Sequence, residues 1–329
     1  MRASQDAMRS IGNLVPSMVK EGKIEQSEIN PSSCGIVQPG NRGIDPCVTG
    51  QDRANFSQSF IFDHSMANLN NKVVWVTGAS SGIGEAVARQ LCERGVRLII
   101  SARNRETLEK VRASCTHPDK VHVIPLDLSD PDSLEKKAGE ALAIYGRVDV
   151  LIMSGGISQR SFALDTVMDV NRQLMEVNYF SSVTLTKALL PSMVENAWGM
   201  IVPVSSLVGK FGTPFRSGYS ASKHALHGYF DSLRAEMWNK GIRVTIITPG
   251  FIRTNISVNA FSADGSATNK MDNAQARGMS ADECATKMIR SIEREKEEVR
   301  IGGKETIGVL LKRYFPRIFS RMVRKAKVR

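Results

Sequence analysis

A glycine-rich turn between a β-branched run and a helix-forming segment constrains this fold more than any other feature. The run is Val73-Val-Trp-Val76, and the turn reads Thr77-Gly-Ala-Ser-Ser-Gly-Ile-Gly84. Residues 85–94 then favour a helix that ends at Gly95, a favourable residue after a helix C-terminus. Such a turn lets backbone N–H groups approach a pyrophosphate, beside the positive end of the helix dipole. A tight turn with no ligand is the alternative, but the position directly after the first strand favours the dinucleotide site.

The alternation of strand and helix continues to residue 301. Further strands are predicted at 98–100, 121–125, 148–152, 200–204, 244–247 and 299–301, and helices at 105–114, from Pro131 behind an Asp130 cap, and at 170–196, 218–240 and 280–295. This rhythm implies right-handed crossovers. We predict an α/β fold: a single Rossmann-type, doubly wound parallel sheet of about seven strands, flanked by helices. Pro203 cannot donate to a strand ladder, so we expect a local bulge there.

Three parts of the chain differ in composition. Residues 1–68 are rich in Ser, Asn, Gln and Gly without periodicity, which is typical of a disordered extension and leaves organelle targeting open. Residues 69–305 form the predicted Rossmann domain, with a substrate loop at about 253–278. Residues 306–329 form a basic amphipathic segment, in which apolar residues recur at helical spacing.

Charge and cysteine content narrow the functional classes. The net charge is +11, and the segment 312–329 contains basic residues and no acid. That segment fits peripheral contact with an anionic membrane surface through 307–329, or packing on the domain with its basic side solvated. No nucleic-acid-binding module accompanies it. The five cysteines lack C-x-x-C spacing, so we expect no metal site and a reducing intracellular compartment, in the cytoplasm or at a membrane surface.

The end of the second strand predicts which dinucleotide binds. An NAD site usually has a carboxylate there to hold the ribose 2′-hydroxyl, whereas this chain reads Ser101-Ala-Arg-Asn-Arg105. Because Arg103 can pair with a 2′-phosphate, we predict NADP(H) as the cofactor. The alternative is that Arg103 and Arg105 are exposed residues at a helix start. Asp127 fits an acceptor for the adenine amino group, or a cap for the next helix.

A second motif predicts proton transfer. Tyr219 and Lys223 are four residues apart on a predicted helix and so share one face. A lysine ammonium close to a phenol favours the phenolate and lowers the tyrosine pKa from its ordinary value of about 10. Ser206, just past the fifth strand, could donate to a substrate carbonyl and stabilise a developing alkoxide.

Together these motifs resemble those of the short-chain dehydrogenase/reductase superfamily, over residues 70–329. The sequences of residues 214–224 and 257–265 resemble those of the dehydrogenase/reductase member 7B-like branch. The resemblance implies an NADP(H)-linked carbonyl/alcohol oxidoreductase with catalytic Ser206, Tyr219 and Lys223. It also implies that Asn178 holds a water in a proton relay and that Thr254 contacts the nicotinamide amide. The cofactor-binding residues expected on this basis are Gly78, Ser80, Ser81, Gly82, Ile83, Gly84, Arg103, Asn104, Asp127, Leu128, Tyr219, Lys223, Pro249, Gly250, Ile252 and Thr254.

One departure from the family pattern keeps a second function open. The family's Asn-Asn-Ala-Gly after the fourth strand is Met153-Ser-Gly-Gly156 here. The alternative to an enzyme is therefore an NADP(H)-binding sensor or scaffold with little turnover. For the enzyme we expect a lipophilic carbonyl substrate, such as a lipid, steroid or retinoid, because a membrane-touching tail would bring the chain to it. Homo-oligomerisation is left open.

Overall fold

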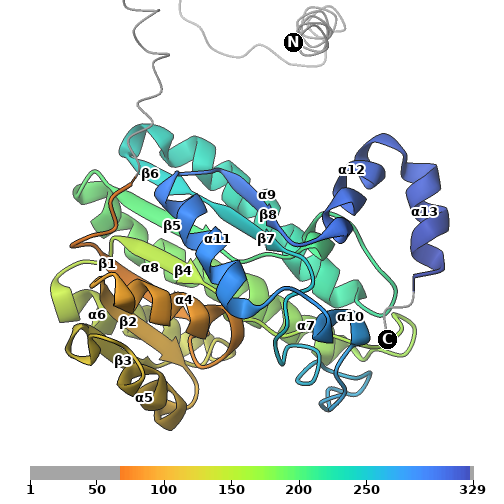
Figure 1. Cartoon of the computed structure of the whole chain (residues 1–329), viewed down its shortest axis with the longest axis horizontal. Helices are drawn as coiled ribbons and strands as arrows, with labels where there is room; N and C mark the ends of the chain where they lie inside the picture. The colour runs from red at the N-terminus through yellow and green to blue at the C-terminus, as the bar shows by residue number, and fades with distance from the viewer. Residues whose placement is uncertain (1–66, 327–329) are drawn as a thin grey trace, which may run out of the picture. The chain divides into compact units, whose positions relative to one another are not determined.

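Six parallel strands form the central sheet of the computed structural model, which describes residues 67–326. Predictions for residues 1–66 lie outside that range. The strands are β1 (Val73–Thr77), β2 (Arg97–Ala102), β3 (Val121–Pro125), β4 (Val150–Met153), β5 (Gly199–Pro203) and β6 (Ile242–Val244). Their order is β3-β2-β1-β4-β5-β6, which is the predicted Rossmann-type arrangement (Figure 1). The order reverses between β1 and β4, and in such sheets the ligand binds at the carboxyl ends beside that point.

Pro203 explains why the strand count departs from about seven. β6 and β7 (Ile246–Pro249) are separated only by Thr245, and β7 pairs with β8 (Glu298–Ile301). Beside β5, the Thr245 N–H donates to the Ile201 carbonyl at 2.9 Å. The hydrogen-bond ladder resumes where the Ser205 N–H donates to the Ile247 carbonyl at 2.7 Å. Pro203 lies between these two bonds and has no N–H, so the expected irregularity takes the form of a gap in the ladder.

Helices cover both faces of the sheet. α4 (Gly82–Glu93), α5 (Arg105–Ala113) and α11 (Ala281–Glu293) pack on one face, and α6 (Pro131–Tyr145), α8 (Ser181–Glu195) and α9 (Ser217–Met237) on the other. Successive residues of β1 enter opposite cores: Val74 and Val76 the first, Val73 and Trp75 the second. Asp130 precedes α6 as predicted, but its side chain makes no capping hydrogen bond.

The long helix predicted at 170–196 is interrupted. α7 (Met168–Met175) and α8 are joined by a π-helical turn, Glu176–Phe180. A π turn inserts an extra residue into the helix and changes the direction of the side chains there. Asn178 lies in this turn and is buried.

The C-terminal segment forms two short helices, α12 (Ile307–Tyr314) and α13 (Pro316–Arg324), after the single-turn α10 (Asn273–Ala276) of the predicted substrate loop. Phe319 of α13 is buried against Leu207 and Phe211, and its ring meets the Phe211 ring edge-on at 5.0 Å. Packing on the domain, one of the two expectations for this tail, is therefore observed for the side of α13 that carries Phe319. Within residues 67–326, no helix has the length and apolar character needed to cross a bilayer.

Candidate active site

A cavity of about 900 Å³ opens at the carboxyl ends of the strands, between the loops that follow β1, β2, β3, β4, β5 and β7. This is the position where parallel α/β sheets bind ligands. All predicted site residues line it except Gly84 and Asn178. The lining members of the predicted set are Gly78, Ser80, Ser81, Gly82, Ile83, Arg103, Asn104, Asp127, Leu128, Ser206, Tyr219, Lys223, Pro249, Gly250, Ile252 and Thr254.

The glycine turn forms a cradle that side chains would fill. Gly78 has φ +69°, and a Cβ there would lie 2.5 Å from the Cα of Gly155. Gly82 has φ +59°, and its Cβ would meet the Thr254 side chain at 2.9 Å. Gly84 acts differently: a Cβ there would lie 2.3 Å from the Gly78 carbonyl, so this glycine lets α4 pack on the turn. Backbone N–H groups at the start of α4 can therefore reach a pyrophosphate.

The other end of the cavity contains the residues expected at the adenosine. Arg103 is exposed, and it forms no ion pair with another described residue. The Asn104 side chain accepts from the Thr107 N–H at 2.9 Å and so caps α5. Asp127 does not cap α6, because its carboxylate accepts from the Ser129 N–H at 2.9 Å and the Ser129 hydroxyl at 2.7 Å.

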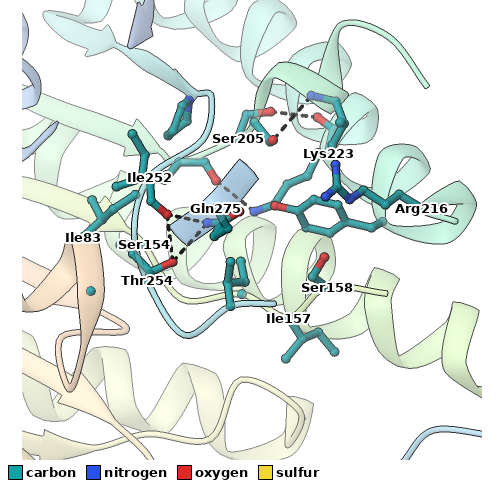
Figure 2. Close-up of a pocket in the computed structure, with 18 of the residues that line it drawn as sticks. Ile83, Ser154, Ile157, Ser158, Ser205, Arg216, Lys223, Ile252, Thr254 and Gln275 are labelled. Carbon is teal, nitrogen blue, oxygen red and sulfur yellow. Dashed lines mark hydrogen bonds between the residues drawn. The ribbon is translucent and has the colours of Figure 1, made fainter. Parts of the chain in front are cut away.

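The proton-transfer residues lie together where α9 lines the cavity. Tyr219 and Lys223 project from the first turns of α9, and both are buried. The Lys223 ammonium donates to the Val204 carbonyl at 2.9 Å and lies 5.9 Å from the centroid of the Tyr219 ring. Figure 2 shows Lys223 near Ser205 and Arg216, with Ile83 and Thr254 across the cavity. Ser206 caps a short turn by accepting from the Val208 N–H at 3.4 Å.

Two buried amides fix the loop after β4. Asn178 accepts from the Ile157 N–H and donates to the Ile157 carbonyl and the Ser222 hydroxyl, each at 2.9 Å. The Gln159 side-chain amide oxygen accepts from the Gly218 N–H at 2.9 Å and so caps α9, which has no local side-chain cap. Asn178 therefore acts from behind the cavity wall, joining this loop to α9.

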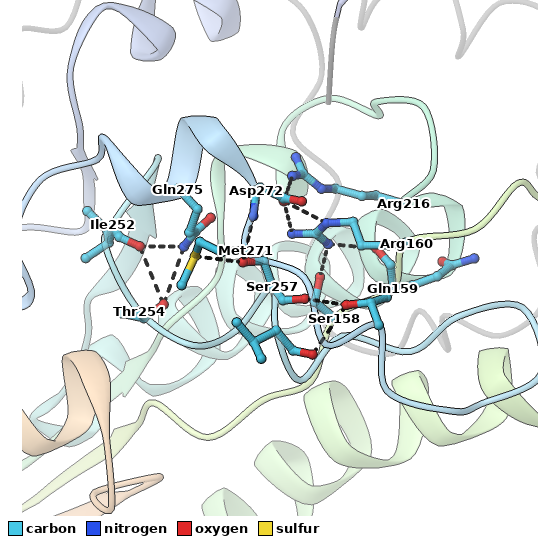
Figure 3. Close-up of polar contacts among 12 residues, drawn as sticks. Ser158, Gln159, Arg160, Arg216, Ile252, Thr254, Ser257, Met271, Asp272 and Gln275 are labelled. Carbon is cyan, nitrogen blue, oxygen red and sulfur yellow. Dashed lines mark hydrogen bonds and ion pairs between the residues drawn. The ribbon is translucent and has the colours of Figure 1, made fainter. Parts of the chain in front are cut away.

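A cluster of three buried charges lies beside Tyr219, and the sequence had not indicated it. Arg160, on the loop after β4, donates to Asp272 through Nε at 2.8 Å, and Arg216 donates to the same carboxylate oxygen at 3.0 Å. Figure 3 shows both guanidinium groups converging on Asp272. All three side chains are at most 7% exposed. The two guanidinium groups share one carboxylate oxygen, and both arginines line the cavity.

This cluster changes the expected electrostatics of the tyrosine. Burial raises the pKa of Tyr219, while a hydrogen bond from Ser206 and the charges of Arg160 and Arg216 lower it. Burial also lowers the pKa of Lys223 to about 8. Because burial is the largest of these effects, the pKa of Tyr219 is raised overall, whereas a lowered pKa was expected; the contributions that lower it come from Ser206, Arg160 and Arg216.

The tail and the substrate loop complete the cavity. Leu311, Phe319, Met322 and Val323 line it from α12 and α13, and Gln275 lines it from α10. Gln275 donates to the Ile252 carbonyl and, at 3.4 Å, to the Thr254 hydroxyl, which holds the loop after β7. The helical spacing of apolar residues in the tail was visible in the sequence, but their contribution to the cavity was not.

His224 and His227, which lie on the same helix as Lys223, each contact a nearby oxygen atom. His227 Nε2 lies 3.0 Å from the Ser205 hydroxyl, and burial lowers the pKa of His227 to about 4. His224 Nδ1 lies 2.7 Å from the Ser220 carbonyl. Across the described part of the chain, no group of three or more His, Cys, Asp or Glu side chains is arranged to hold a metal ion.

Comparison with known proteins gives matches over most of the chain. The short chain dehydrogenase family matches residues 72–265. Dehydrogenase/reductase SDR family member 7B of Rattus norvegicus is 44% identical over 267 residues, 79% of this chain and 82% of the rat protein. Dehydrogenase/reductase SDR family protein 7-like of Anopheles gambiae is 46% identical over 242 residues, 71% of this chain and 76% of that protein.

Solved structures agree with this result. A short-chain dehydrogenase from Streptomyces avermitilis superposes with a TM-score of 0.66 at 30% identity, covering 77% of this chain and 96% of that one. An alcohol dehydrogenase from Thermococcus sibiricus, in complex with 5-hydroxy-NADP, gives a TM-score of 0.61 at 26% identity, covering 71% and 97%. The chain thus belongs to the short-chain dehydrogenase family, whose fold binds a nicotinamide cofactor, and it is an oxidoreductase similar to the member 7B proteins.

Proposed function

We propose that this chain is an NADP(H)-dependent oxidoreductase that transfers hydride between the nicotinamide and a carbonyl or secondary-alcohol carbon of a lipophilic substrate. One observation carries the proposal: Ser206, Tyr219 and Lys223 line the same cavity as the Gly78–Gly84 turn. The cofactor supplies or accepts the hydride, and the protein must supply the proton and stabilise the oxygen.

Tyr219 is the proton donor in the reductive direction. Its phenol gives a proton to the substrate oxygen, and the resulting phenolate is stabilised by the Ser206 hydroxyl and by the charges of Arg160 and Arg216. Ser206 can also donate to the substrate carbonyl, where negative charge develops. Lys223, tethered to the Val204 carbonyl, gives a second positive charge on the same wall at pH values below about 8.

The end of β2 supports NADP(H) over NAD(H). Ser101-Ala-Arg-Asn104 has no carboxylate to hold a ribose 2′-hydroxyl, and exposed Arg103 is available for a 2′-phosphate. The structurally similar Thermococcus alcohol dehydrogenase was solved with 5-hydroxy-NADP. The loop that lost the family's asparagines keeps its close packing, because Gly155 lies directly against Gly78.

The apolar part of the cavity wall supports a lipophilic substrate. Leu207, Val208 and Phe211 line the cavity from the segment after β5, and apolar residues of α12 and α13 pack against Leu207 and Phe211. Such a wall favours a substrate with a substantial apolar portion, because its burial removes apolar surface from water.

The test is NADPH oxidation by the purified full chain over a panel of lipophilic ketones, with small water-soluble ketones alongside. Tyr219→Phe should lose about 100-fold or more in kcat, as expected when a general acid is removed. Tyr229→Phe, on the same helix but outside the cavity lining, is the matched control and should keep its activity. Equal activity of Tyr219→Phe and the wild type would refute the proposed proton donor. NADPH binding without turnover across the panel would favour the sensor or scaffold function.

A further inference from the structure

The two C-terminal helices carry apolar side chains that remain largely exposed to solvent. We call this surface the tail ridge; its members are between 46% and 66% exposed and are Ile307, Leu310, Tyr314, Phe315, Ile318 and Met322. Ile307, Leu310 and Tyr314 follow one stripe of α12, and Ile318 and Met322 are one turn apart on α13. Exposed apolar residues that cluster in this way mark an interaction surface.

Packing of the tail on the domain does not account for the ridge. The inward sides of the helices already supply the apolar contacts: Phe319 is 4% exposed, and Leu311 and Val323 pack with it. Gly308 allows this approach, because a Cβ there would meet the Phe211 ring at 3.2 Å. α12 and α13 therefore carry apolar residues that pack on the domain and others that remain exposed, with Ile307 and Met322 at the edge of the cavity.

Positive charge flanks the ridge. Six exposed basic side chains lie along the two helices and directly after α13, and none forms an ion pair with another described residue; they are Lys312, Arg313, Arg317, Arg321, Arg324 and Lys325. The sequence contains no acid between 312 and 329. A second copy of the chain would bring the same positive charge to this surface, whereas an anionic bilayer attracts it by about 1 kcal/mol per basic residue.

We propose that the tail ridge docks the chain on the surface of an anionic lipid bilayer, with the ridge in the acyl boundary and the basic residues at the headgroups. Ile307 and Met322 belong both to the ridge and to the cavity lining, so the cavity opens next to the docked surface. The route by which a lipophilic substrate enters from the bilayer follows from this placement and depends on the proposed function; docking itself does not.

Vesicle co-sedimentation of the full chain tests the proposal. The probes are phosphatidylcholine vesicles with and without phosphatidylserine, at low and high salt. Binding should require phosphatidylserine and should weaken as salt screens the charges. Leu310→Ser/Ile318→Ser, which changes ridge residues outside the cavity lining, should weaken binding by about tenfold or more. Arg317→Gln/Arg321→Gln should also weaken it by about tenfold or more, from the loss of two surface charges.

Two matched controls show whether the ridge itself is responsible. Leu164→Ser removes an apolar side chain that is 95% exposed outside the tail, and Arg172→Gln removes an exposed arginine of α7. Both should bind phosphatidylserine vesicles as the wild type does. If these controls weaken binding as much as the tail variants, or if the wild type does not bind, the proposal is wrong. Loss of a dimer in Leu310→Ser/Ile318→Ser, with no vesicle binding by the wild type, would identify a second copy as the occupant instead.

The same samples separate this proposal from the proposed function. Leu310→Ser/Ile318→Ser should oxidise NADPH with a water-soluble ketone at the wild-type rate and lose only its advantage with a ketone delivered in phosphatidylserine vesicles. Vesicle binding without any NADPH oxidation would support docking and contradict the oxidoreductase proposal. Turnover without vesicle binding would do the reverse.

Discussion

Tyr219 lies at a position where opposing effects act on one proton. Burial raises its pKa, and Ser206, Arg160 and Arg216 lower it. Asp272 accepts hydrogen bonds from both guanidinium groups, so its negative charge reduces their combined effect on the phenol. Burial is the largest effect and leaves the pKa of Tyr219 raised, and the charges of the cluster reduce that rise, so changes of opposite sign in the cluster should have opposite results.

The first prediction uses this sign difference. In the reductive direction Tyr219 must carry a proton, so activity should fall as the pH rises through its pKa. Arg216→Met removes a positive charge and should move this fall to higher pH by about 1 unit. Asp272→Asn removes the negative charge and should move it to lower pH. The measurement is the pH profile of kcat/KM for NADPH-dependent reduction.

A compensating variant and a remote pair complete that experiment. Arg216→Met/Asp272→Asn restores the net charge of the cluster, so its profile should return toward that of the wild type. Arg172→Met and Asp169→Asn break an exposed ion pair on α7 and should leave the profile unchanged. Shifts of the same sign in the two single cluster variants would show that the cluster acts only through the loop structure.

The second prediction concerns stability. Lys223 has a pKa of about 8 in the folded chain, against an ordinary value of 10.5. Below pH 8 both states bind the proton; between 8 and 10.5 the unfolded state binds more, so stability should rise with pH in that window. Lys223→Met should lack this rise, and its difference in unfolding free energy from the wild type should change by about 3 kcal/mol across the window. Urea unfolding at a series of pH values would measure it, and a constant difference would contradict the lowered pKa.

Among the elements, α13 is held to the domain mainly through one aromatic residue. Phe319 packs on Phe211 and Leu207, while most of its neighbours on the helix are exposed. Phe319→Ala removes this anchor and should release the tail, because truncation of a buried Phe costs about 3–5 kcal/mol. The expected result is rapid tryptic cleavage within 312–325, while the rest of the domain stays folded. Ile318→Ala, one residue away and exposed, should leave cleavage unchanged; equal cleavage of both variants would refute the anchor.

The elements also show what the sequence could predict. β1 and the glycine turn were readable because a buried β-branched run and positive-φ glycines leave local signatures. The π turn around Asn178 was not, because its sequence continues a helical pattern on both sides. Asp272 lies 112 residues from Arg160 and 56 from Arg216, so only the tertiary fold brings the cluster together. For the same reason, the tail's amphipathic pattern predicted a helix but not the cavity wall that it forms.

At the scale of the whole molecule, the cavity is built from loops that are distant in sequence. The turn after β1, the ends of β2 and β3, and the loop after β7 all contribute to the predicted cofactor side. A cofactor that bridges them contacts the folded chain but not the unfolded chain. Its binding should therefore stabilise the domain as a unit, and the size of the effect reports its affinity.

The last prediction uses this linkage to separate NADP(H) from NAD(H). NADPH at about 100 times its Kd should add about 2.7 kcal/mol to the free energy of unfolding. NADH at the same concentration should add much less, because Arg103 has no 2′-phosphate to pair with. Arg103→Ala should reduce the NADPH effect toward that of NADH. Arg105→Ala should not, because Arg105 is the neighbouring exposed arginine and pairs with Glu109 at 3.6 Å. Thermal unfolding with each cofactor measures these differences, and equal stabilisation by both cofactors in the wild type would refute the assignment of Arg103.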